Sequence, residues 1–149
     1  MNGKQLADLV QQRWEILNQL IRMGQEQLTV IEKGHMSDLM RLLSRKQQPL
    51  NQLVELGEKL RAAKSDDPQT RVWESDSMRE RCRKQQDECE KMNLEVLAIE
   101  AECEAKLSHN REELRQRLER VDSGWQAVSG YADHSIQVNS GGTLDLSSD

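Results

Sequence analysis

The side chains with the greatest chemical potential in this sequence are three cysteines, Cys82, Cys89 and Cys103, because thiolates act as nucleophiles and as metal ligands. They are seven and fourteen residues apart in a stretch without proline, and in a straight helix that spacing places them along one stripe, more than about 10 Å apart. Cα atoms so far apart cannot be bridged within the chain. An odd number of cysteines also fits a reducing compartment. We interpret all three as small hydrophobic residues of a helix seam.

The histidines and carboxylates form no catalytic pattern. His35, His109 and His134 fall in a turn, on the polar side of a helix and in the C-terminal tail, and none has a Cys or Asp partner at a metal-ligand spacing. Glutamates at 100, 102 and 104 form a charged face, with no predicted cleft that would hold them for acid–base chemistry. The sequence therefore predicts no catalytic residue, no metal site, no cofactor and no enzymatic activity.

The composition favours narrow seams between long helices over a thick core, because 36% of the 149 residues are hydrophobic, 32% are charged and 3% are aromatic. A net charge of −5 leaves no excess positive charge to neutralise phosphates, so nucleic acid is excluded as a partner. No stretch approaches the roughly 18 apolar residues that cross a bilayer, and the N-terminal residues contain no secretory apolar run. We expect a cytoplasmic protein without membrane insertion.

The rest of the chain is organised around a helix predicted for 77–128, which contains no proline and only one glycine, Gly124. At about 1.5 Å per residue it would extend about 75 Å, too long for one helix of a globule of this size. Apolar or small residues recur along it every three or four positions. This seam comprises Met78, Cys82, Cys89, Met92, Val96, Ile99 and Cys103, and continues through Leu107, Leu114, Leu118, Val121, Trp125 and Val128.

Two further helices are predicted, at 3–32 and 36–63, each with an apolar stripe of its own. Gly34 is a natural stop for the first, and the sequence leaves open whether the second folds back or continues at an angle. The central stripe of the second helix comprises Leu39, Leu43, Leu50, Leu53 and Leu60, widened by Met40, Leu42, Val54 and Leu56. Pro49 falls inside this helix, but the stripe keeps to one face on both sides of it, which favours a kink over two helices. We therefore predict an all-α fold, an elongated antiparallel helical bundle or coiled coil of three long helices within a domain at 1–130.

The tail at 131–149 differs in composition from the helices, since it contains Gly141-Gly142 and several serines but no Lys or Arg. Such a segment cannot bury enough apolar surface to order itself, so we predict a flexible, disordered C-terminal tail. The helices themselves combine long apolar stripes with methionines on or beside the seams, a pattern typical of surfaces that accept apolar partners. The residues alone thus favour a binding module for an amphipathic helix.

Several strings resemble the FlgN family of flagellar export chaperones. The strings are Trp14-Glu15-Ile16-Leu17, the segment GQEQLTVIEKGHMSDLMRLLSRKQQPLNQLVELGEKLR, Trp73 before the last helix, CRKQQDECEKMNLEVLAIEAECEAKLSHNREEL with Asn93, Leu94 and Leu97, and the tail opening Tyr131-Ala132-Asp133. Together they cover most of the chain, in the family's order of a helix, a glycine-containing break, a leucine-rich helix and a closing helix.

The resemblance implies a cytoplasmic chaperone that binds the amphipathic terminal helices of hook-associated (hook–filament junction) proteins. It would prevent their premature assembly and deliver them to the flagellar type III export apparatus. The expected client surface is the late part of the long helix, and Tyr131 with the tail is the candidate contact for the export gate. The client surface comprises Leu107, Leu114, Leu118, Val121 and Trp125.

The alternative is a homo-oligomeric coiled-coil scaffold without an export client, in which a second copy of the chain covers the same seams. A self-sufficient coiled coil prefers Leu or Ile at nearly every seam position, whereas Gln85, Asn110 and the cysteines dilute this seam. That composition favours packing within one chain, and a homodimer stays possible beside it.

Overall fold

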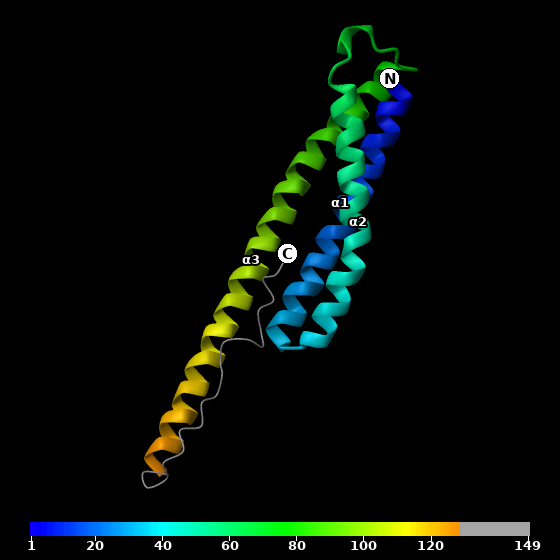
Figure 1. Ribbon diagram of the computed structural model, residues 1–149. Helices are drawn as coiled ribbons and strands as arrows, with labels where there is room; N and C mark the ends of the chain where they lie inside the picture. The colour runs from blue at the N-terminus through cyan, green and yellow to red at the C-terminus, as the bar shows by residue number, and fades with distance from the viewer. Residues whose placement is uncertain (129–149) are drawn as a thin grey trace. The chain divides into compact units, whose positions relative to one another are not determined.

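The computed structural model describes residues 1–128, without the side chains of Trp125, Ala127 and Val128. It contains three long helices, α1 (Gly3–Lys33), α2 (Met36–Ala63) and α3 (Asp76–Val128), and a short 3-10 helix, η1 (Pro68–Thr70), between the last two (Figure 1). No strand occurs in these residues. The predicted all-α fold with three long helices is confirmed.

Helices α1 and α2 form an antiparallel hairpin whose turn is determined by Gly34. Its φ of 72° is in the left-handed region, which glycine adopts without steric cost. The Gly34 N–H donates to Ile31 O and the His35 N–H to Val30 O, both at 3.1 Å, so two carbonyls at the end of α1 are satisfied. This turn settles the question left open by the sequence, because α2 folds back on α1.

Helix α3 runs parallel to α1 within a compact unit that covers Met1–Cys103. Gln85 Nε2 donates to Gln11 Oε1 at 2.5 Å, Trp14 Nε1 donates to Glu88 Oε2 at 2.9 Å, and further along Gly24 faces Ile99. A Cβ at Gly24 would lie 2.7 Å from Ile99 Cγ2, so the absence of a side chain allows this close approach. The three helices of this unit therefore run up, down and up.

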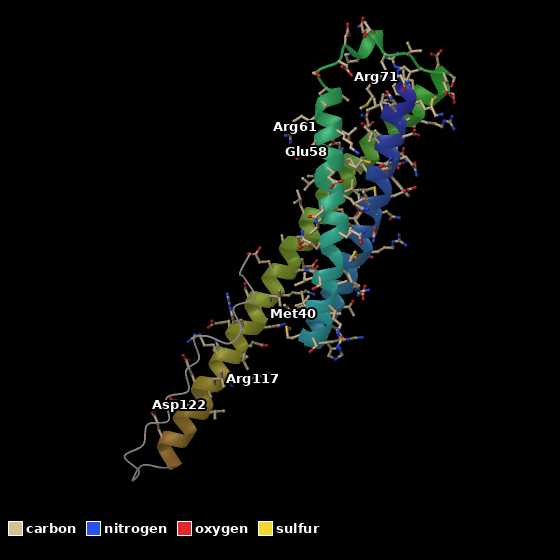
Figure 2. The ribbon with its side chains drawn as sticks, turned by 45° about the vertical axis from the view of Figure 1, so that its right-hand side comes forward. Met40, Glu58, Arg61, Arg71, Arg117 and Asp122 are labelled. Atoms are coloured by element: carbon tan, nitrogen blue, oxygen red, sulfur yellow. The ribbon has the colours of Figure 1, made fainter. Side chains whose placement is uncertain are left out.

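The loop between α2 and α3 is tied to the start of α1. The Gly3 N–H donates to Val72 O at 2.8 Å, and Arg71 donates from Nη2 to Ala63 O at 3.2 Å and from Nε to Met1 O at 3.3 Å. Arg71 thus satisfies a carbonyl at the C-terminus of α2 and joins the loop to Met1, just before α1. Figure 2 shows Arg71 at this end of the hairpin and Met40 near the opposite end of α2.

The predicted seams of α1 and α3 form the core of the unit. The buried hydrophobic residues include Leu6, Val10, Leu17, Leu20, Ile21 and Ile31 of α1, and Cys82, Cys89, Val96 and Cys103 of α3. All three cysteines are buried, as their interpretation as seam residues predicted. The core is a narrow line of side chains between helices, as the low hydrophobic content requires.

The buried face of α2 differs from the predicted one. We expected Leu43 on its central stripe, but that side chain is exposed and Leu42 is buried. The buried residues of α2 are Leu39, Leu42, Lys46, Pro49, Leu56 and Ala63. Lys46 and Pro49 occupy two positions of the buried stripe. Because lysine is usually exposed and proline is rare inside helices, the leucines alone predicted the neighbouring stripe. Helix α2 continues through Pro49, as predicted.

A second compact unit begins at Glu104 and contains the remainder of α3. Surface ion pairs stabilise this part of the helix, including Arg115 with Glu112 at 2.7 Å and Arg115 with Glu119. The tail at 131–149, for which disorder was predicted, lies outside the described residues, and the predicted domain boundary at residue 130 stays a prediction.

Candidate functional site

The predicted client surface lies on α3 in the second unit. Leu114 is 40% exposed and Val121 is 57% exposed, whereas Leu107 and Leu118 are half-buried. Their spacing of seven, four and three residues keeps them on one stripe of the helix. Trp125 belongs to α3 but its side chain is not described, and Tyr131 lies outside the described residues. The four described members thus form an apolar stripe, and two of them present a large hydrophobic side chain to solvent.

The cysteines are protected from chemistry by burial. Burial raises the pKa of the Cys89 thiol to about 11 and also raises the pKa of Cys82. Cys89 Sγ donates to Val10 O at 3.9 Å, a weak bond that holds the thiol in the α1–α3 seam. A thiol that stays protonated at neutral pH is a poor nucleophile and a poor metal ligand.

The histidines of the described part face solvent. His35 Nδ1 lies 3.6 Å from Asp38, and His109 Nε2 lies 3.8 Å from Glu113, with both histidines more than half exposed. Among residues 1–128, no three side chains of His, Cys, Asp or Glu are grouped so that they could hold a metal ion. No helix in the same part of the chain is long and apolar enough to cross a membrane.

A buried polar cluster at the centre of the bundle was missed by the sequence interpretation. Lys46 of α2 is 4% exposed, its Nζ donates to Gln27 Oε1 of α1 at 3.0 Å, and it forms an ion pair with Glu100 of α3. Burial lowers the pKa of the Lys46 ammonium. Glu100, predicted to belong to a charged face, keeps 41% of its side chain exposed, and its carboxylate pairs with Lys46. The sequence could have indicated this cluster only through the positions of Gln27 and Lys46, which fall at the helical spacing of the buried residues in α1 and α2.

This cluster connects all three helices through polar groups whose hydrogen bonds are satisfied, and no buried side-chain nitrogen or oxygen of the described residues lacks a partner. Polar groups at seam positions define which residues face each other, because a shift of one helix would leave them buried without partners. The charged and polar groups of the cluster pair with one another across the three helices, an arrangement that supports helix register.

Comparison with known proteins assigns this helical chain to a family. The family described as FlgN protein matches residues 1–143, nearly the whole chain, which confirms the resemblance found in the sequence. FlgN is a family of chaperones and not of enzymes. Searches of curated proteins and of solved structures returned no match. Because one family accounts for almost every residue of the chain, the protein belongs to the FlgN family of flagellar export chaperones.

Proposed function

We propose that the protein is a cytoplasmic flagellar export chaperone whose clients are hook-associated proteins of the hook–filament junction. It binds their amphipathic terminal helices, prevents premature assembly and delivers them to the flagellar type III export apparatus. Family membership supports the chaperone class. The observation that supports a client surface is the apolar stripe of α3, with Leu114 and Val121 exposed to solvent.

The proposed binding mode is a helix laid along a hydrophobic face. Fully burying a Leu or Val side chain contributes about 1.5–3 kcal/mol, so covering the exposed part of Leu114 or Val121 contributes about 1 kcal/mol each. The client helix gains a similar amount from its own apolar face. While that face is covered it cannot associate with other subunits, which is how binding prevents assembly before export.

The stripe also includes Leu107, Leu118 and Trp125, and we propose that all five residues contact the client. Tyr131 and the tail that follows it are proposed as the contact for the export apparatus. The two surfaces are separable by experiment. Deletion of residues from Tyr131 onward should leave client binding intact and reduce export of the client, and undiminished export would contradict the proposal for Tyr131.

The decisive experiment is the light-scattering mass of the protein alone and mixed with terminal fragments of hook-associated proteins. A defined complex is expected for the wild type and its loss is expected for Leu114→Asp with Leu118→Asp. The matched control is Leu94→Asp with Leu97→Asp, which places the same charges at exposed leucines of α3 outside the proposed stripe. Unchanged circular dichroism must accompany both variants.

Three results would count against the proposal. Intact binding in the Leu114 and Leu118 variant would remove the stripe as the client surface. Loss of binding in the control instead would move the client surface to Leu94 and Leu97. A stable homodimer that ignores every fragment would support the coiled-coil scaffold, since its seams would then be satisfied by a second copy.

A further inference from the structure

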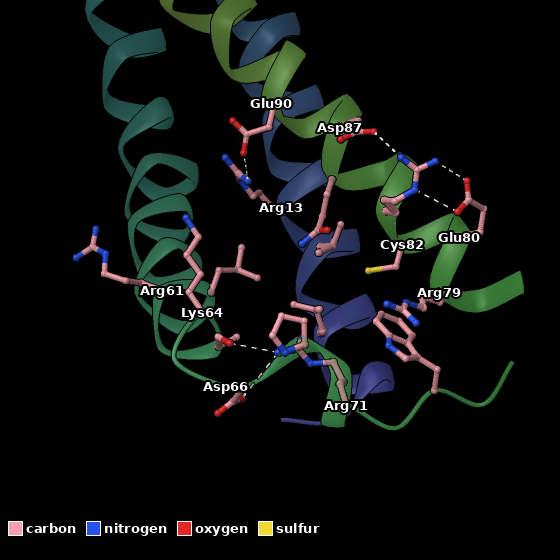
Figure 3. A pocket seen from close by; sticks show the side chains of 18 of the residues that line it. Arg13, Arg61, Lys64, Asp66, Arg71, Arg79, Glu80, Cys82, Asp87 and Glu90 are labelled. Atoms are coloured by element: carbon pink, nitrogen blue, oxygen red, sulfur yellow. Dashed lines mark hydrogen bonds and ion pairs between the residues drawn. The ribbon is translucent and has the colours of Figure 1, made fainter. Parts of the chain in front are cut away.

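The first unit has a groove between the second half of α2 and the first part of α3. Its volume is about 950 Å³. Figure 3 shows α2 and α3 on its two sides, with α1 behind and Arg71 at the end where the loop closes it. On α3 the lining extends from Asp76 to Asn93, a length of about 27 Å. A helix of four to five turns has this length.

The floor of this α2–α3 groove is apolar. It is formed by Leu6 and Val10 of α1, Leu60 of α2, Cys82 of α3, and Trp73 from the loop. Leu60 and Trp73 are only half-buried, so they retain apolar surface that a partner could cover. An apolar floor between two helix walls is the shape that receives the hydrophobic face of an additional helix.

Gly57 leaves one wall of the groove unfilled. It lies in α2 and lines the groove, and a Cβ built on it meets no atom within 4 Å. Glycine in the middle of a helix costs about 1 kcal/mol relative to alanine. No close approach within the described structure requires this glycine, which contrasts with Gly24 and Gly3.

In the described part of the chain, most acidic side chains around the groove are in ion pairs, but half of the basic ones are not. Four of the five acidic side chains that line it are in ion pairs, whereas three basic side chains, Arg61, Lys64 and Arg79, make none within residues 1–128. The pairs are Arg13 with Glu90 at 3.5 Å, Arg71 with Asp66 at 3.9 Å, and Arg83 with Glu80 at 2.6 Å and Asp87 at 3.7 Å. The rim thus presents unneutralised positive charge in a chain whose net charge is −5.

The unneutralised positive charges lie at one end of the groove. Arg61 and Lys64 are at the C-terminus of α2, and Arg79 is in the first turns of α3, so all three lie near the loop. The C-terminus of a helix carries partial negative charge, and a free terminal carboxylate adds a full one. A helix whose carboxyl end points toward the loop would place these charges beside Lys64 and Arg79.

We propose that the α2–α3 groove is a second client contact, separate from the α3 stripe, which receives an amphipathic helix with acidic residues beside its apolar face. The helix lies with its carboxyl end toward the α2–α3 loop, and its apolar face covers Leu60 and Trp73. This inference rests on the proposed function, because the helix belongs to the export client. Its chemistry follows from the groove itself.

The steric test uses Gly57. Gly57→Trp fills the groove from a position where the structure has room for a side chain, and Gly57→Ala is the matched control that keeps the groove open. The probe is a carboxyl-terminal fragment of a hook-associated protein, titrated into the full-length chain. Gly57→Trp should weaken binding about tenfold or more, a loss of about 1.4 kcal/mol, whereas Gly57→Ala should bind as the wild type does.

The electrostatic test reverses two rim charges. Lys64→Glu with Arg79→Glu should weaken binding about tenfold and remove most of its dependence on salt between about 50 and 300 mM. The matched control is Lys4→Glu with Arg22→Glu, which reverses two exposed charges of α1 that do not line this groove. Amidation of the fragment's terminal carboxylate should weaken binding to the wild type and strengthen binding to the charge-reversed variant, where it removes a repulsion.

The outcomes separate the two proposals. Failure of the wild type to bind any fragment refutes the proposed function, and with it the identity of the groove's occupant. Binding by the wild type that is unchanged in Gly57→Trp and in the charge-reversed variant refutes the groove alone. A homodimer that Gly57→Trp dissociates would show that a second copy of the chain occupies the groove, which also overturns the inference.

Discussion

The contact between α1 and α3 at Gly24 gives a prediction that can be worked from the structure. In a helix without tertiary contacts, replacing glycine by alanine stabilises by about 1 kcal/mol, because alanine loses less conformational entropy. At Gly24 the new Cβ would lie 2.7 Å from Ile99 Cγ2. Ile99 is β-branched and has one strongly preferred χ1 rotamer in a helix, so the methyl group cannot easily rotate away. Overpacking of this kind costs about 1–3 kcal/mol.

The matched variant is Gly57→Ala, where the new Cβ meets no atom within 4 Å. Both substitutions gain the same helix propensity, so the difference between their free energies of unfolding isolates the overlap with Ile99. We expect Gly57→Ala to stabilise by about 1 kcal/mol and Gly24→Ala to be less stable than it by about 1–3 kcal/mol. Urea unfolding followed by circular dichroism measures both values.

A double-mutant cycle identifies the contact directly. Ile99→Ala removes Cγ2, so it should cost less in the Gly24→Ala background than in the wild type, with a coupling of about 1 kcal/mol. The effects of Ile99→Ala and Gly57→Ala on the free energy of unfolding should add to within about 0.5 kcal/mol, because these residues are not in contact. If Gly24→Ala stabilises as much as Gly57→Ala does, α1 and α3 do not approach closely at this position, and the packing argued above is refuted.

Three further predictions concern the turn, the thiols and the polar cluster. Gly34→Ala should destabilise by about 1–2 kcal/mol in urea unfolding, because φ is 72° there. Burial raises the pKa of Cys89 to about 11, so the folded protein keeps a proton that the unfolded chain loses above about pH 8.5. The free energy of unfolding should therefore fall between pH 8.5 and about 11, less steeply in Cys89→Ala. Lys46→Met with Gln27→Leu should raise the free energy of unfolding in urea by about 1 kcal/mol or more, because a buried charge is replaced by apolar side chains while Glu100, whose side chain is 41% exposed, is solvated.

Each of these has a result that contradicts it. Equal stability of Gly34→Ala and wild type would mean that the turn does not require a left-handed residue. An identical alkaline slope in Cys89→Ala would mean that this thiol is not protected in the fold. A lower urea midpoint for the double variant at Lys46 and Gln27 would show that the polar cluster contributes net stability.

Much of the fold is determined locally. The spacing of apolar residues along α1 and α3 repeats every three or four positions, and a helix is the conformation that gathers such residues on one face. The break at Gly34 is likewise local, since its left-handed conformation satisfies the last carbonyls of α1 from within six residues. The seam role of the cysteines followed from the same spacing. Family membership could also be inferred, because the strings that carry it are contiguous.

The features that local sequence left undetermined depend on residues distant in the chain. Which of the neighbouring stripes of α2 is buried depends on how α1 and α3 pack against it. Lys46 resembles a surface residue until Gln27 and Glu100, from two other helices, are seen beside it. The α2–α3 groove is formed because α2 and α3 both pack on α1 and leave a space between them. The helical period of a sequence determines the face of the helix on which a side chain lies. Which residues that side chain contacts depends on how the apolar stripes of all three helices pack together, and this is a property of the tertiary structure.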